Sequence, residues 1–150
     1  MSLSIPAALL AQVRRHGEQA YPEEGAGLML GAFEGGNRRV TQLLPLDNHF
    51  QPDSRNRRYL IAPRDLLRAE DEAERLGLEI VGAFHSHPDH PAQASDFDTQ
   101  WALPVYSYLI TQVQTGEAVE SRSWRLTEDR GAMLEEPVQI TNPSVAEEAV

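Results

Sequence analysis

The stretch AFHSHPDHPAQASDFD, residues 83–98, holds three of the five histidines of this 150-residue chain. It continues the apolar run LEIVGAFHSH, and we predict a strand over Leu78–His87 that the following proline ends. Side chains alternate between the two faces of a strand, so His85 and His87 project to one face while Ser86 points away. Two imidazoles on one face at a strand end form half of a metal site.

The third ligand of such a site is predicted to be a carboxylate, because the chain has no cysteine. A catalytic zinc takes three protein ligands and keeps a fourth position for water. A short helix is predicted from Ser95 to Ala102, and Asp98 then lies one turn after Ser95 on the same side. Asp98 is therefore the best candidate. The pair H-x-H alone also fits a polar strand end near solvent, whereas the longer spacing favours a metal site.

The whole pattern, H-S-H-P-x6-S-x2-D, resembles without a gap the signature of the JAMM (JAB1/MPN) metalloprotease family. That family also has an upstream glutamate, which small bacterial members carry in a segment resembling Y-P-x-E-x-C-G-L-L-L-G after the first helix. YPEEGAGLMLG, Tyr21–Gly31, stands at that place and supplies Glu24. Ala26 replaces the family's cysteine, which is not a zinc ligand. The resemblance extends to about Leu126.

The resemblance implies a role for each of five residues. His85, His87 and Asp98 are expected to hold one Zn²⁺ ion. Glu24 is expected to be the general base, since a carboxylate can accept a proton from water and pass it to a leaving amine. Ser95 is expected to stabilise the oxyanion, because a hydroxyl can donate a hydrogen bond to the tetrahedral oxygen.

The resemblance also implies a fold and a substrate. Together with the order of the predicted elements, it indicates a single α/β (α+β) domain over residues 1–134, with a mixed, mostly antiparallel sheet flanked by helices. The local sequence of residues 135–150 predicts a loose tail. Small stand-alone members resemble enzymes that hydrolyse a peptide or isopeptide bond at the C-terminus of a ubiquitin-like sulfur-carrier protein (ThiS/MoaD-like). The alternatives are a non-catalytic binding or scaffold module of the MPN fold, a peptidase with another peptide substrate, and a metal hydrolase of small molecules.

Composition limits the partners. The formal net charge is −10, which argues against nucleic acid or an anionic membrane as the main partner, because both favour positive charge. No apolar run approaches the ~20 residues of a spanning helix. The N-terminal segment lacks the basic start and long apolar run of a signal peptide. We therefore expect a cytoplasmic protein.

Local patterns predict the remaining elements. Ser4 is expected to cap a first helix that has Pro6 in its first turn and ends near Gly17. Proline at the start and glycine after the end mark a second helix over Pro63–Gly77. Strands are predicted at Gly27–Phe33 and Arg38–Leu46, which form a hairpin, and at Tyr59–Ala62, Val105–Val113 and Glu117–Leu126.

Several other residues receive weaker interpretations. The basic loop with Arg55, Arg57 and Arg58 either binds an acidic surface or free carboxylate of a partner, or is simply solvated. Glu23 would face away from Glu24 in an extended segment, and His90 lies in the loop after the strand. Surface positions are expected for His16 and His49, and core positions for Phe84, Trp101 and Trp124.

Overall fold

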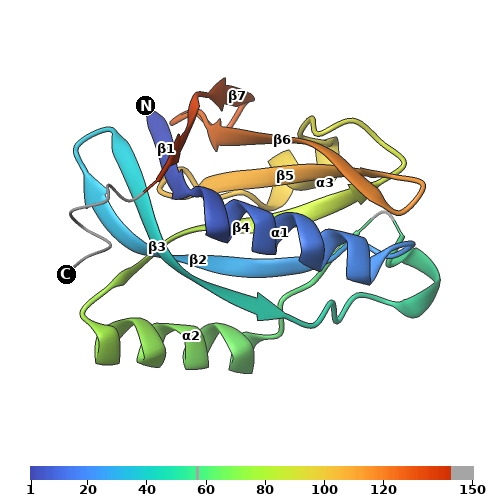
Figure 1. Cartoon of the computed structure of the whole chain (residues 1–150), viewed down its shortest axis with the longest axis horizontal. Coiled ribbons are helices and arrows are strands. Elements are labelled where there is room, and N and C mark those ends of the chain that lie inside the picture. The colour runs from blue at the N-terminus through green and yellow to red at the C-terminus, as the bar shows by residue number, and fades with distance from the viewer. Residues whose placement is uncertain (57, 143–150) are drawn as a thin grey trace.

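The computed structural model describes residues 1–56 and 58–142 and shows one eight-stranded sheet with three helices (Figure 1). The order of strands across the sheet is β7-β6-β5-β4-β2-β3-β1-β8. The strands are β1 (Ser2–Pro6), β2 (Ala26–Glu34), β3 (Asn37–Leu46), β4 (Glu79–Pro88), β5 (Ser107–Gln114), β6 (Glu117–Leu126), β7 (Met133–Glu136) and β8 (Val138–Thr141). The helices are α1 (Ala7–Ala20), α2 (Pro63–Leu76) and α3 (Asp96–Trp101), with one 3-10 turn at Pro52–Ser54.

The sheet is mixed and mostly antiparallel, as predicted. Three neighbouring pairs are parallel: β1 with β3, β1 with β8, and β4 with β5. The other four are antiparallel. β4 lies between β2 and β5, and its residues from Ile80 to Pro88 are all buried. The histidine strand is therefore at the centre of the molecule.

The two faces of the sheet carry separate cores. On one face Val13 of α1 packs in a cluster with Met29 and Phe84. On the other face Ala73 of α2 packs in a cluster with Leu28 and Ala83. In Figure 1, α1 crosses in front of the sheet and α3 lies behind it. Odd-numbered β4 residues from Ala83 onward thus face α2 and α3, while even-numbered ones face α1.

The predicted hairpin and second helix are confirmed. β2 and β3 pair antiparallel through a tight turn. Helix α2 begins with Pro63, whose missing N–H would have no partner in the first turn. It ends at Gly77, which adopts a φ of 69° in the left-handed region that glycine reaches without steric cost.

The start of the chain differs from the prediction. Ser4 does not cap a helix, because it lies inside β1, where its hydroxyl bonds the side chains of Asn37 and Gln139. Pro6 occupies the N-cap position of α1 and makes no side-chain capping bond. The neighbours Leu3 and Ile5 are fully buried, so pairing with β3 and β8 outweighs the local capping signal.

Three further predictions are wrong. Residues 59–62 form no strand. Residues 135–142 are not a loose tail: β7 pairs with β6, and β8 pairs with β1, so this segment completes both edges of the sheet. Trp101 is 68% exposed rather than part of the core, whereas Phe84 and Trp124 are buried as expected. The rest of the predicted tail, 143–150, lies outside the described residues.

Within the described part of the chain, none of the helices has the length and apolar character needed to cross a bilayer.

Candidate metal centre

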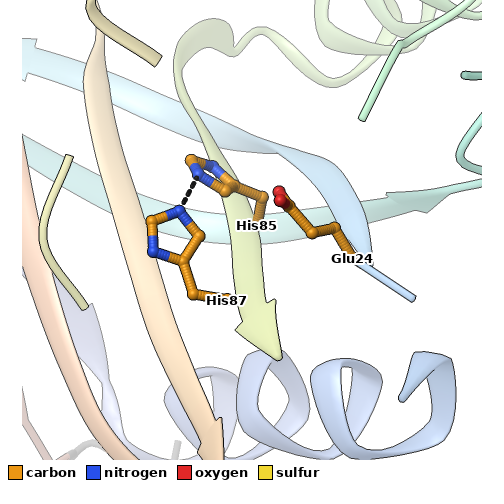
Figure 2. A group of neighbouring side chains, drawn as sticks. All are labelled: Glu24, His85 and His87. Atoms are coloured by element: carbon orange, nitrogen blue, oxygen red, sulfur yellow. Dashed lines mark hydrogen bonds between the residues drawn. The ribbon is translucent and has the colours of Figure 1, made fainter. Parts of the chain in front are cut away.

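Two buried imidazoles lie at the end of β4. His85 and His87 both project to the face that carries α3, and their Nε2 atoms are 3.2 Å apart (Figure 2). His85 is 1% exposed and His87 is 6% exposed. The alternation of β4 places them side by side, as the H-x-H spacing predicts.

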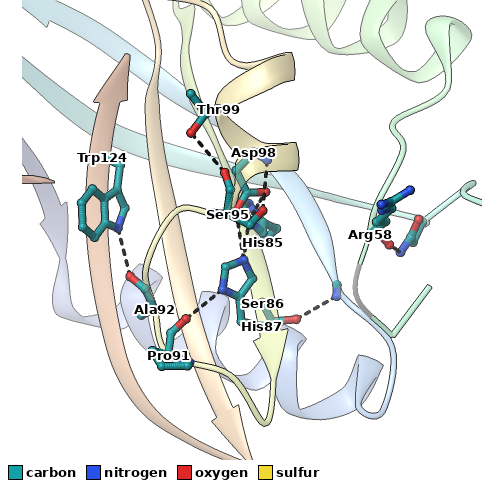
Figure 3. Close-up of polar contacts among 12 residues, drawn as sticks. Arg58, His85, Ser86, His87, Pro91, Ala92, Ser95, Asp98, Thr99 and Trp124 are labelled. Carbon is teal, nitrogen blue, oxygen red and sulfur yellow. Dashed lines mark hydrogen bonds and ion pairs between the residues drawn. The ribbon is translucent and has the colours of Figure 1, made fainter. Parts of the chain in front are cut away.

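Asp98 reaches both imidazoles from α3. Its Oδ1 lies 3.1 Å from Nε2 of His85, and its Oδ2 lies 3.1 Å from Nε2 of His87. A reciprocal cap orients this carboxylate: the Ser95 N–H donates to Oδ2 at 2.9 Å, and the Asp98 N–H donates to the Ser95 hydroxyl oxygen at 3.1 Å (Figure 3). Six residues of helix therefore suffice to aim the carboxylate, because the N-cap fixes its first turn.

The loop that connects β4 to α3 sets the orientation of His87. Nδ1 of His87 lies 2.8 Å from the Pro91 carbonyl oxygen, to which it donates, and Nε2 is the nitrogen that faces the cluster (Figure 3). The indole of Trp124 holds the same loop by donating to the Ala92 carbonyl at 3.0 Å. Such bonds to the far nitrogen are how proteins orient histidine ligands.

Glu24 approaches the imidazoles from the segment before β2. Ala26 pairs with His85 in the sheet, and Glu24, two residues earlier, projects to the same face. Figure 2 shows its carboxylate turned toward the histidines. Ser86 holds the neighbouring backbone: the Gly25 N–H donates to the Ser86 hydroxyl at 2.8 Å, and the Ser86 N–H donates to the Gly25 carbonyl at 3.0 Å.

The two carboxylates are in different electrostatic environments. Burial raises the pKa of Glu24 to about 8, with nearby Asp98 adding to the rise and His87 opposing it. Burial would also raise the pKa of Asp98, but the charges and hydrogen bonds of His85 and His87 outweigh it and hold that pKa well below its usual value. In the metal-free site near pH 7, therefore, Glu24 holds a proton and Asp98 is an anion.

The two imidazoles differ as well. Burial lowers the pKa of His85, and the attraction of Asp98 offsets this only in part. Burial would lower the pKa of His87 too, but Asp98 and the Pro91 carbonyl raise it above its ordinary value.

The donor atoms fit a divalent metal. A tetrahedral zinc with Zn–N distances of 2.0–2.1 Å holds its donors about 3.3 Å apart, close to the 3.1–3.2 Å among His85, His87 and Asp98. Glu24 also belongs to the cluster, because one of its oxygens lies within 4.8 Å of an atom of each histidine. Oε1 of Glu24 and Nδ1 of His85 are buried without a partner among the described residues. A buried cluster with such unmet polar atoms is suited to a bound ion and water.

Two cavities open beside the cluster. One of about 370 Å³ is lined by Glu24, His87, Ser95 and four residues of the loop after β4: His90, Pro91, Gln93 and Ala94. The other, of about 290 Å³, is mainly apolar and borders Asp98. Its lining includes Phe50, Tyr59, Leu60, Phe97, Trp101 and Leu103.

The structure brings together all five residues singled out from the sequence: Glu24, His85, His87, Ser95 and Asp98. Their chemical roles remain predictions. Among the described residues, Glu23 does not belong to the group that could hold a metal ion, which contains Glu24, His85 and His87.

The remaining histidines lie outside the cluster. His90 is exposed at the cavity rim, and His49 pairs with Asp65 at 3.2 Å. His16 and His49 are half-buried rather than fully at the surface.

The basic loop has contacts of its own. Arg55 donates to the Phe50 carbonyl, and Arg58 lies over the Phe97 ring at 5.0 Å. Arg57 lies outside the described residues.

Sequence reasoning missed two neighbours of the site. Ser86, which was predicted only to point away from the histidines, anchors the residue after Glu24. Tyr59, expected in a strand, stacks on His85 with ring centroids 4.5 Å apart. Both contacts join distant segments, and no local pattern signals them.

The chain belongs to the family of prokaryotic homologues of the JAB domain, which matches residues 6–127. This family assignment agrees with the fold and with the motif on β4. The matched segment includes Glu24, both histidines, Ser95 and Asp98.

Individual relatives extend the comparison. The chain is 37% identical over 106 residues to a Thermus thermophilus protein named "Probable TtuB-protein conjugate cleaving protease". That match covers 68% of this chain and 66% of the relative, just under two thirds of its length.

Two solved structures share the fold. The solution structure of a Desulfitobacterium hafniense protein has a TM-score of 0.82 and 28% identity, and the match covers 96% of each chain. The solution structure of a Salinibacter ruber protein has a TM-score of 0.73 and 36% identity, and the match covers 96% of this chain and 94% of that one.

Proposed function

We propose that this protein is a zinc-dependent peptidase or isopeptidase that cleaves a bond at the C-terminus of a ubiquitin-like sulfur-carrier protein. The observation that carries the proposal is the convergence of two imidazoles with two carboxylates of opposite pKa shift in one buried cluster. Pairs of acids whose pKa values are pushed apart mark separate acid–base roles.

The pKa shifts divide the roles between the carboxylates. Asp98 stays ionised and touches both imidazoles, so it serves with His85 and His87 as the third metal ligand. Glu24 has a raised pKa and an unpaired oxygen, so it serves as the proton carrier. A zinc ion held there would act as a Lewis acid on the scissile carbonyl and lower the pKa of water from 15.7 toward ~7.

The chain's own groups perform the remaining steps. A bound cation would favour the ionised form of Glu24, which would then accept a proton from the attacking water and later donate it to the leaving amine. The Ser95 hydroxyl lines the same cavity and already accepts from the Asp98 N–H, so its proton is free to point toward the developing oxyanion. Burial of the cluster reduces the competition from bulk water.

The relative named for cleaving TtuB-protein conjugates supports a protein conjugate as the substrate class. An extended tail needs a surface beside the site, and the two cavities that border Glu24 and Asp98 provide one. A cytoplasmic location is proposed with this substrate. A non-catalytic binding module is the alternative; it would need no proton carrier, whereas Glu24 is buried with an unpaired oxygen.

Native mass spectrometry with added Zn²⁺, followed by cleavage of a ubiquitin-like carrier extended beyond its C-terminus, tests the proposal. The parent should bind one zinc and cleave the extension. His87→Ala and Asp98→Ala should lose zinc, and Glu24→Gln should keep zinc but lose most turnover. A folded parent that binds no zinc would refute the metal centre, and normal turnover in Glu24→Gln would remove Glu24 as the base.

A further inference from the structure

The backbone of Glu24 lies outside every helix and strand. The residue comes after α1 and before β2 begins at Ala26. Glu24 is 4% exposed, so its N–H and C=O need partners that regular structure does not supply. Both partners come from the segment between β3 and α2, residues 47–62, which we call the 47–62 loop. The Glu24 N–H donates to the Arg55 carbonyl, and the Glu24 carbonyl accepts from the Asn48 side chain at 2.9 Å.

The side-chain amide of Asn48 makes four hydrogen bonds, one of which is the bond to Glu24. Nδ2 donates to the Glu24 carbonyl at 2.9 Å and to the Arg58 carbonyl at 2.8 Å. Oδ1 accepts from the N–H groups of Phe50 and Leu60, each at 3.0 Å. Two acceptors face one end of the amide and two donors face the other, so the four partners fix its orientation. Asn48 therefore ties the two ends of the 47–62 loop to Glu24.

The carboxylate of Glu24 depends on this backbone support. Its Oε1 is buried without a hydrogen-bond partner among the described residues, so no side-chain bond fixes that atom. Gly25 is fixed on one side by Ser86 of β4. The other side of the segment is held by the 47–62 loop through Asn48 and Arg55. The position of the carboxylate relative to the histidines thus follows from where these two anchors place the backbone.

We propose that Asn48 is a positioning residue that holds Glu24 in place for proton transfer through its bond to the Glu24 carbonyl. The proposal rests on the role of Glu24 as general base. Asn48 acts through Glu24: its side-chain hydrogen bonds within the described residues go to Glu24 and to its own loop, whereas His85, His87 and Asp98 are carried by β4 and α3. A general base must come within about 2.6–3.2 Å of its proton, and a 1 Å displacement costs on the order of 10²-fold in rate.

Asn48→Asp is the sharpest perturbation. It keeps the acceptor for Phe50 and Leu60 but replaces two donated bonds with an oxygen facing two carbonyl oxygens. We expect kcat to fall by roughly 10- to 100-fold, consistent with a sub-ångström to 1 Å displacement of Glu24. KM and zinc affinity should change by less than about 3-fold, because the expected zinc ligands are unchanged and Glu24 is the cavity-lining side chain that the substitution displaces.

The matched control is Asn56→Asp, the same change at an exposed position of the same loop, which should leave all parameters unchanged. Asn48→Ala, which removes all four bonds without adding a charge, is measured beside Asn48→Asp in case the latter fails to fold.

A double-variant cycle separates positioning from a general structural role. If Asn48 acts through Glu24, Asn48→Asp should cause no further loss of turnover in a Glu24→Gln background. An equal loss in both backgrounds, or parallel losses of zinc affinity and kcat, would overturn the proposal.

Amide hydrogen exchange at Glu24 provides a readout that needs no activity. Its N–H should be protected in the parent and exchange at least 10-fold faster in the Asn48 variants. If the parent is active and the Asn48 variants keep its protection at Glu24, the positioning role is overturned and the peptidase proposal stands. If the Asn48 variants exchange faster but the parent cleaves nothing, the contact is supported and the peptidase proposal is refuted instead.

Discussion

Replacing Glu24 with glutamine should stabilise the metal-free protein in a pH-dependent way. The carboxyl is 4% exposed, and burial raises its pKa from 4.5 to about 8. Below pH 4.5 the side chain is neutral in both the folded and the unfolded protein. As pH rises from 4.5 to 8, the unfolded chain releases the proton while the folded chain retains it, so the parent loses stability across this window. Glutamine cannot ionise, so the stability of Glu24→Gln does not fall for this reason as pH rises.

The magnitude follows from the size of the shift. The rise of 8 − 4.5 = 3.5 pKa units corresponds to about 5 kcal/mol at 1.36 kcal/mol per unit, as an upper bound. The unfolding free energy of Glu24→Gln minus that of the parent should therefore grow by about 1.4 kcal/mol per pH unit between pH 5 and 8 and then level off.

Urea unfolding of both proteins at pH 5, 6, 7, 8 and 9, with a chelator present, measures this difference directly. Glu23→Gln removes a negative charge from the neighbouring half-exposed position and is the matched control. Added zinc should flatten the slope, because a cation in the cluster favours the ionised form of Glu24. A difference that stays constant from pH 5 to 8, or a parent that gains stability relative to the variant, would refute the account of Glu24 as a buried neutral acid.

Two further substitutions test other parts of the structure. Ser95→Ala should keep zinc, lose about 1 kcal/mol of stability with its helix cap, and lower kcat by roughly 10²–10³-fold; steady-state kinetics with an unchanged kcat would remove Ser95 from the chemistry. Glu136→Gln should lower the unfolding free energy by about 3–5 kcal/mol, because Arg125, 6% exposed and 2.9 Å from Glu136, would remain buried without a counter-charge. Urea unfolding with a loss below 1 kcal/mol would show that the pair is replaceable.

Strong local signals account for the parts of the fold that were predicted correctly. Helix α2 carries a proline at its start and a glycine after its end, and β2 and β3 are joined by a glycine-containing turn. The H-x-H spacing on β4 and the S-x2-D spacing at α3 each act over a few residues, so strand alternation and helix capping were enough to predict their geometry.

The wrong predictions involve contacts between distant segments. β1 looked like the cap of a helix because its pairing partners, β3 and β8, are far away in the sequence. Residues 135–142 looked like a tail because their short strands depend on β6 and β1 already being in place. Trp101 has the size of a core residue, but α3 turns it outward beside the apolar cavity.

The sequence by itself determined which side chains share a face and which chemistry they offer, because those properties depend on the 2.0 and 3.6 residue periods of strands and helices. Only the tertiary structure decided that Glu24 lies beside His85, since this follows from the pairing of Ala26 with His85 across the sheet. The same holds for Asn48, whose four bonds join segments on both sides of β3. Register and loop packing are set by the burial of both faces of the sheet together, and no short stretch of sequence contains that information.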